Sequence, residues 1–105
     1  MNRGWVISLA EVPSRLFERN PEAVRFVNKM LRLCMAMECG SITPEKLVKE
    51  IKKLLRKLKE MDNKEFASAI YPILMRDFIE QLPEEMANRL KEECLEALVD
   101  LELSF

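Results

Sequence analysis

The sequence predicts an all-α fold: an antiparallel four-helix bundle-like domain with an extended N-terminal arm and a proline-kinked third helix. Composition excludes the main alternatives, because 49% of the 105 residues are hydrophobic, 33% are charged and only 2 are glycine. Disorder requires lower hydrophobicity, and all-β folds require more turn residues. Four long stretches carry apolar residues at helical spacing, and short loops between them favour antiparallel neighbours. The length predicts a single helical domain over residues 1–105.

The first segment, 1–12, is predicted to be an extended arm. Its alternate residues are large and apolar: Trp5, Ile7 and Leu9. This alternation indicates an extended stretch with one apolar edge. One strand cannot form a sheet alone, so the arm either packs over the helices, pairs with its copy in another chain, or begins a helical turn at Ser8 that Pro13 ends. A short helical turn over residues 13–19 follows.

Helix 21–39 has a clear beginning and end. Asn20-Pro21 supplies an N-cap residue and a favoured first-turn proline, and Gly40 is a typical residue just beyond a helix C-terminus. The polar side of this helix is narrow, and the rest of its circumference is apolar. A helix of that kind is usually central and contacts several others.

Helix 44–61 begins at Thr43-Pro44 and is amphipathic. Its apolar residues form one continuous stripe: Leu47, Val48, Ile51, Leu54, Leu55, Leu58 and Met61. The opposite face is rich in lysine and arginine. The pattern predicts one face packed in the core and one basic face toward water.

Helix 64–81 is predicted to start at a capping box in which Asp62 takes the place of the usual Ser or Thr and Glu65 completes the motif. Pro72 removes a backbone hydrogen bond in the middle of this helix, and the apolar face changes direction there. Both observations predict a kink at Pro72. The same helical arithmetic places Asp77 on the water side.

Helix 84–102 follows Leu82-Pro83 and carries two apolar stripes. The inward stripe contains Met86, Ala87, Leu90, Cys94, Ala97, Leu98 and Leu101. The second stripe lies on the far side and contains Leu95, Val99 and Leu103, with Glu92, Glu93, Glu96 and Asp100 beside it. Three aligned apolar residues call for an explanation. Either the N-terminal arm with Trp5 covers them, another subunit does, or they are simply exposed.

Charge is unevenly distributed along the chain. Residues 1–76 carry 15 Lys and Arg against 9 Asp and Glu, whereas residues 77–105 carry 2 against 9. Two basic stripes form a candidate patch: Arg25, Lys29 and Arg32 on helix 21–39, and Lys49, Lys53 and Arg56 on helix 44–61. The sequence leaves open whether the two stripes form one surface. Basic stripes are either solvated helix faces or contacts for phosphate backbones.

Residue types needed for common chemistry are scarce. The chain has no histidine, and its three cysteines are too few for a Cys-only zinc site. Two glycines cannot supply the usual phosphate-binding loop. We therefore predict no catalytic residue, no metal, no cofactor and no small-molecule substrate. The odd cysteine count and the lack of a signal peptide or membrane span predict a cytoplasmic protein without membrane contact.

These observations favour a non-enzymatic protein–protein interaction module. We expect a small helical subunit of a larger complex that self-associates, as a dimer for example, or docks onto a protein partner. The second stripe of helix 84–102, with Trp5 of the arm, is the predicted interface. The alternative is a nucleic-acid-binding subunit that uses the basic patch, although no recognised motif and no interleaved aromatic residues accompany it.

Overall fold

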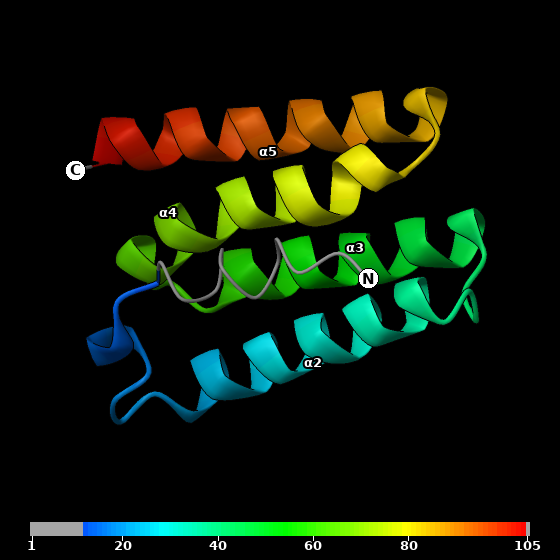
Figure 1. Cartoon of the computed structure of the whole chain (residues 1–105). Helices are drawn as coiled ribbons and strands as arrows, with labels where there is room; N and C mark the ends of the chain where they lie inside the picture. The colour runs from blue at the N-terminus through cyan, green and yellow to red at the C-terminus, as the bar shows by residue number, and fades with distance from the viewer. Residues whose placement is uncertain (1–11, 105) are drawn as a thin grey trace.

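The computed structural model describes residues 12–104, and this part of the chain is helical with no β-strand. The all-α class is therefore confirmed. The elements are a short 3₁₀ turn η1 (Ser14–Leu16), α2 (Pro21–Glu38), α3 (Pro44–Glu60), α4 (Lys64–Ile73), η2 (Leu74–Phe78), η3 (Ile79–Gln81) and α5 (Glu84–Ser104). Figure 1 shows the long helices lying alongside one another in chain order, from α2 to α5. Nearly all of the predicted arm, including Trp5, lies outside the described residues.

The N-terminal caps of α2 and α3 are the residues that the sequence predicted. The Oδ1 atom of Asn20 accepts a hydrogen bond from the Ala23 N–H at 3.2 Å. The Oγ1 atom of Thr43 accepts one from the Lys46 N–H, also at 3.2 Å. Each side chain satisfies a backbone donor that the first helical turn leaves unpaired.

The end of α2 is a Schellman motif centred on Gly40. Gly40 has a φ of +66°, in the left-handed region that glycine enters without steric cost. The Gly40 N–H donates to the Met37 carbonyl at 3.2 Å, and the Ser41 N–H donates to the Ala36 carbonyl at 3.0 Å. This pair of bonds satisfies carbonyls that the helix end would leave free, so the prediction for Gly40 is confirmed.

The cap of α4 differs from the prediction. Asn63, rather than Asp62, accepts the hydrogen bond from the Phe66 N–H, at 3.0 Å. Asp62 has a φ of +49°, a left-handed conformation that turns the chain before the helix begins and is incompatible with an N-cap. The predicted capping box is therefore wrong. Glu65 instead accepts a hydrogen bond from Arg15, which lowers the pKa of the Glu65 carboxyl.

The predicted helix 64–81 divides into three segments of different hydrogen bonding. The α-helical part ends at Ile73, one residue after Pro72. A π-helical segment, η2, continues from Leu74 to Phe78, and the 3₁₀ turn η3 ends at Gln81. A π-helix has more residues per turn than an α-helix, so residues after Ile73 face directions that uniform helical arithmetic does not predict.

The core contains the inward stripes of all the long helices. Leu47, Ile51, Leu54, Leu55 and Leu58 of α3 are buried, as are Ala87, Leu90 and Cys94 of α5. Phe66 of α4 contacts Phe17 and Phe26 edge-to-face, with ring centroids 6.0 and 5.9 Å apart. Such pairs add about 0.5–1.5 kcal/mol to simple burial. Between residues 12 and 104, no helix has both the length and the apolar character needed to cross a membrane.

Candidate functional site

The second apolar stripe of α5 is exposed. The exposed fractions are 52% for Leu95, 53% for Val99 and 82% for Leu103. The three residues lie four apart, which places them on one face of the helix. Trp5, the fourth member of the predicted interface, lies outside the described residues. The remainder of this face is acidic, because Glu92, Glu93, Glu96 and Asp100 are also exposed.

A second exposed apolar stripe lies on α2, where the sequence predicted a central helix with only its narrow polar side toward water. Val24 is 42% exposed and Met35 is 61% exposed, and the half-buried Leu31 lies between them on the same face. The prediction is wrong for this face because the apolar arc is wider than the neighbouring helices cover. The width of the apolar arc could have indicated this exposed stripe, but the sequence prediction placed the whole arc in the core.

Parts of the two predicted basic stripes meet in a groove between α2 and α3, which we call the basic groove. Its volume is about 550 Å³. Its charged lining residues are Lys29, Arg32, Lys46, Glu50, Lys53 and Lys57, and its apolar lining includes Leu33, Ile42 and Leu54. Among the described residues, five cations therefore line this groove together with one carboxylate, that of Glu50, whose Oε1 atom lies 3.5 Å from the Lys53 Nζ atom.

The structure divides the predicted basic patch. Lys29, Arg32 and Lys53 line the basic groove together, whereas Arg25, Lys49 and Arg56 are exposed outside its lining. Lys46 and Lys57, which are not part of the predicted basic patch, also line the groove. The basic patch is therefore partly assembled, along the α3 edge that faces α2 and not on the outermost face of α3.

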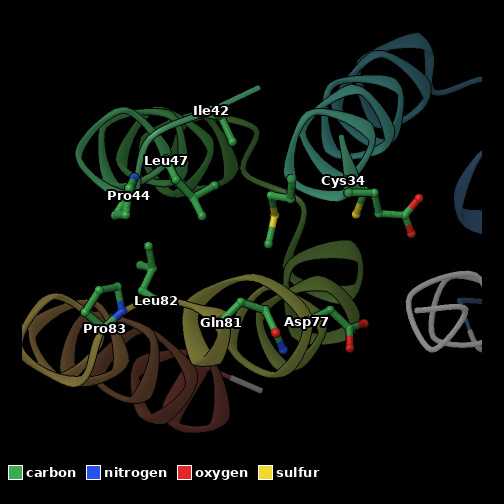
Figure 2. A pocket seen from close by; sticks show the side chains of 10 residues that line it. Cys34, Ile42, Pro44, Leu47, Asp77, Gln81, Leu82 and Pro83 are labelled. Carbon is green, nitrogen blue, oxygen red and sulfur yellow. The ribbon is translucent and has the colours of Figure 1, made fainter. Parts of the chain in front are cut away.

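A second groove, which we call the Asp77 groove, lies at the same end of α2 and has a volume of about 510 Å³. Figure 2 shows its walls: Cys34 from α2, Ile42 from the loop that follows, Pro44 and Leu47 from the start of α3, and Asp77, Gln81, Leu82 and Pro83 from the chain before α5. Met37 and Glu38 complete the lining. Ile42 lines both grooves and so lies between them.

The side chain of Asp77 is largely buried, although the sequence predicted it on the water side. Its side chain is only 10% exposed. Its Oδ1 atom lies 3.6 Å from Arg76 Nε, and its Oδ2 atom is buried without a hydrogen-bond partner. The prediction is wrong because Asp77 belongs to the π-helical η2, whose wider turn changes the direction of its side chain.

The two buried cysteines, Cys34 and Cys94, do not have the properties of reactive nucleophiles. Burial, reinforced by the negative charges of Asp77 and Glu38, raises the pKa of the Cys34 thiol to about 12. Burial also raises the pKa of Cys94 to about 11. Both thiols are therefore protonated at neutral pH, whereas nucleophilic attack requires the thiolate. Cys39 is exposed at the end of α2.

Within residues 12–104, no three His, Cys, Asp or Glu side chains are placed to hold a metal ion. In comparisons with known proteins, no protein-family model, no curated protein and no solved structure matches this chain.

Proposed function

We propose that this chain is a non-enzymatic interaction module that associates with copies of itself through α5. The observation that carries the proposal is the exposed stripe of Leu95, Val99 and Leu103. Single exposed apolar residues are ordinary, but an aligned group rimmed by charged residues is typical of a protein interface. Covering such a stripe removes apolar surface from water, at roughly 25 cal/mol per Å².

The surface that fits the α5 stripe best is α2 of another copy. The α5 stripe is flanked by four carboxylates, and the exposed α2 stripe of Val24, Leu31 and Met35 is flanked by Arg25, Lys29 and Arg32. Packing α5 of one copy on α2 of the next covers both stripes and places opposite charges side by side. Because the two surfaces differ, the contact is heterologous and can be repeated from copy to copy.

Two variants test this contact separately. Leu95→Glu places a carboxylate in the α5 stripe, and Met35→Glu does the same in the α2 stripe. Each variant alone is expected to weaken self-association at least tenfold, as measured by sedimentation velocity on the full chain. Mixing the two variants is expected to restore 1:1 pairs, because one partner supplies an intact α2 and the other an intact α5.

The control is Lys52→Glu, which adds a carboxylate at an exposed position of α3 outside both stripes. It should associate like the unmodified chain. A chain that stays monomeric at high micromolar concentration contradicts the proposal. A third outcome is that Leu95→Glu weakens self-association but mixing the two variants does not restore it. That result supports the role of α5 and rejects α2 as its partner.

A second candidate function is nucleic-acid binding, and the basic groove favours it. Five cations along one groove suit a phosphate backbone, whose binding releases counterions and so depends steeply on salt. Fluorescence anisotropy with single-stranded and duplex probes tests this. Lys29→Ala and Lys53→Ala should weaken binding and lower the salt slope, whereas Lys49→Ala, outside the groove, should have less effect. No binding at low salt rejects this candidate.

We also propose that the chain is one domain in which the long helices form an antiparallel bundle and the third is bent at Pro72. Contacts between α2 and α3 and between α4 and α5 support this arrangement. Pro72→Ala adds a backbone N–H at position 72 and is expected to slow amide hydrogen exchange of the neighbouring residues in the turns on either side. The three free cysteines support a reducing compartment such as the cytoplasm.

A further inference from the structure

We propose that the Asp77 groove binds a small organic cation, a primary alkylammonium whose charged end is held by Asp77 and whose alkyl chain lies along the apolar walls. The site is independent of the α5 stripe and of the basic groove. It is formed by the C-terminal half of α2, the first turn of α3 and the chain from η2 to Pro83 (Figure 2).

The Asp77 carboxylate is the first reason. Its side chain is nine-tenths buried and lines the groove, yet Oδ2 has no hydrogen-bond partner. Buried polar side-chain atoms nearly always have one, because an unpaired charged oxygen loses its hydration without compensation. The adjacent Arg76 Nε lies 3.6 Å from Oδ1, and the Arg76 side chain is largely exposed. The Oδ2 atom of Asp77 can therefore accept a hydrogen bond from a ligand.

The backbone that positions Asp77 is the second reason. Asp77 is the fourth residue of the five-residue π-helical segment Leu74–Phe78. π-Helical turns are rare, and they occur frequently at functional sites because the inserted residue redirects a side chain. Here that change turns an aspartate inward that a regular α-helix would place in water.

The charge of the lining is the third reason. Among residues 12–104, Asp77 and Glu38 are the only charged residues that line this groove, whereas five cations line the basic groove on the other side of Ile42. The negative charge acts inside the groove, since Asp77 and Glu38 both contribute to the raised pKa of the Cys34 thiol. The Asp77 groove is therefore selective for cations.

Size and wall chemistry define the ligand. A volume of about 510 Å³ lies within the range of small-molecule sites. Met37, Ile42, Leu47 and Leu82 supply an apolar wall, and Gln81 adds an amide that can hydrogen-bond a polar end. An ammonium has three donors, enough for Asp77 and one further acceptor. A linear alkylamine fits this combination better than a compact inorganic cation, which gains nothing from the apolar wall.

Titration of the full-length protein with n-pentylammonium, followed by amide NMR shifts, tests the site. The expected shifts cluster in residues 34–47 and 77–83. The neutral analogue 1-pentanol should bind at least tenfold more weakly, because it lacks the charge. Asp77→Asn keeps the size of the side chain, removes its charge and should weaken pentylammonium binding at least tenfold. Glu80→Gln, an equal charge change at an exposed position three residues away, is the control and should bind like the unmodified chain.

Thermal unfolding without ligand supplies a second readout. Asp77→Asn is expected to raise the melting temperature, because it removes a largely buried charge whose Oδ2 atom has no hydrogen-bond partner. A lowered melting temperature contradicts the proposal, since it shows that contacts within the folded chain already compensate the Asp77 charge. Shifts scattered over the acidic face of α5, or binding unaffected by Asp77→Asn, also reject the site. Nα-acetyl-lysine N-methylamide mimics a lysine side chain within a protein. If it binds tenfold more tightly than pentylammonium, the ligand is a lysine of a partner protein and the proposal of a free amine is rejected.

Discussion

Helices α3 and α5 are both amphipathic, yet they differ in what their outer faces carry. The outer face of α3 is almost entirely charged, and its apolar residues Leu47, Ile51, Leu54, Leu55 and Leu58 are buried. The inner face of α5 is buried in the same way at Ala87, Leu90 and Cys94, but its outer face exposes Leu95, Val99 and Leu103. Within the described residues, every large apolar residue of α3 is buried in the core or packed against it. Three large apolar residues of α5 are not covered.

The difference separates apolar residues that stabilise the fold from those available for association. A leucine in contact with the core contributes to the free energy of unfolding of one chain. A leucine on the outer face contributes only when a second surface covers it. The two helices therefore predict different responses to the same kind of substitution, depending on the face and the protein concentration.

The largest effect is expected on the inner faces. Ile51 is 0% exposed and Leu90 is 1% exposed, so truncation leaves a cavity that the surrounding helices cannot fill. Ile51→Ala and Leu90→Ala should each lower the free energy of unfolding by about 2–5 kcal/mol, as measured by urea titration. A loss below about 1 kcal/mol at Leu90 would show that α5 is not an integral part of the core.

The next effect concerns pH and the thiol on the inner face of α5. Burial raises the pKa of Cys94 from 9.0 to about 11, so the folded chain retains a proton that the unfolded chain releases. Stability should therefore fall as pH rises from about 9 to about 11, by at most about 1.4 kcal/mol per pH unit for this thiol. Urea titrations at several pH values, with Cys94→Ala as the control, measure the difference in slope. Equal slopes would contradict the burial of the thiol.

A smaller effect is expected at the helix caps. Thr43 caps α3 and Asn63 caps α4, each with one side-chain hydrogen bond to a backbone N–H. Replacing either by alanine should cost about 1 kcal/mol of stability. Asp62→Ala tests the corrected assignment, because Asp62 caps nothing but has a positive φ. If Asn63→Ala causes no loss of stability, Asp62 can cap α4 in its place, and the predicted role of Asp62 would be supported.

The smallest effect is expected on the outer faces at low protein concentration. Leu95→Ala on α5 and Lys49→Ala on α3 should both change the free energy of unfolding by no more than about 0.5 kcal/mol. At high concentration, Leu95→Ala alone should lower the apparent stability, because it weakens the associated form. A loss above about 1 kcal/mol at every concentration would instead show that the same chain covers the α5 stripe.

Sequence reasoning succeeded where a few neighbouring residues decide the structure. Asn20, Thr43 and Gly40 act within one helical turn, so their roles follow from residue type and position. It failed at Asp62, where two adjacent residues compete for one cap and the turn geometry selects Asn63. It also failed at Asp77, because a proline indicates a disturbed helix but does not specify a π-helical turn after it.

The candidate surfaces divide in the same way. The α5 stripe could be predicted because a second set of leucines at helical spacing exceeds what one core face can hold. The membership of the basic groove could not, because Lys53 faces α2 while Lys49 does not, and that depends on the rotation of α3 about its own axis.

The sequence by itself therefore determined the all-α class, most of the helix ends and the existence of surplus apolar surface on α5. These features depend on local hydrogen bonding and on the 3.6-residue period, which a single chain segment contains in full. Only the tertiary structure decided which basic residues share a groove, that α2 leaves Val24 and Met35 exposed, and that Asp77 lies buried beside Cys34. The first two outcomes depend on how helices rotate against one another, and distant residues set that rotation through packing. The position of Asp77 depends in addition on the π-helical turn η2.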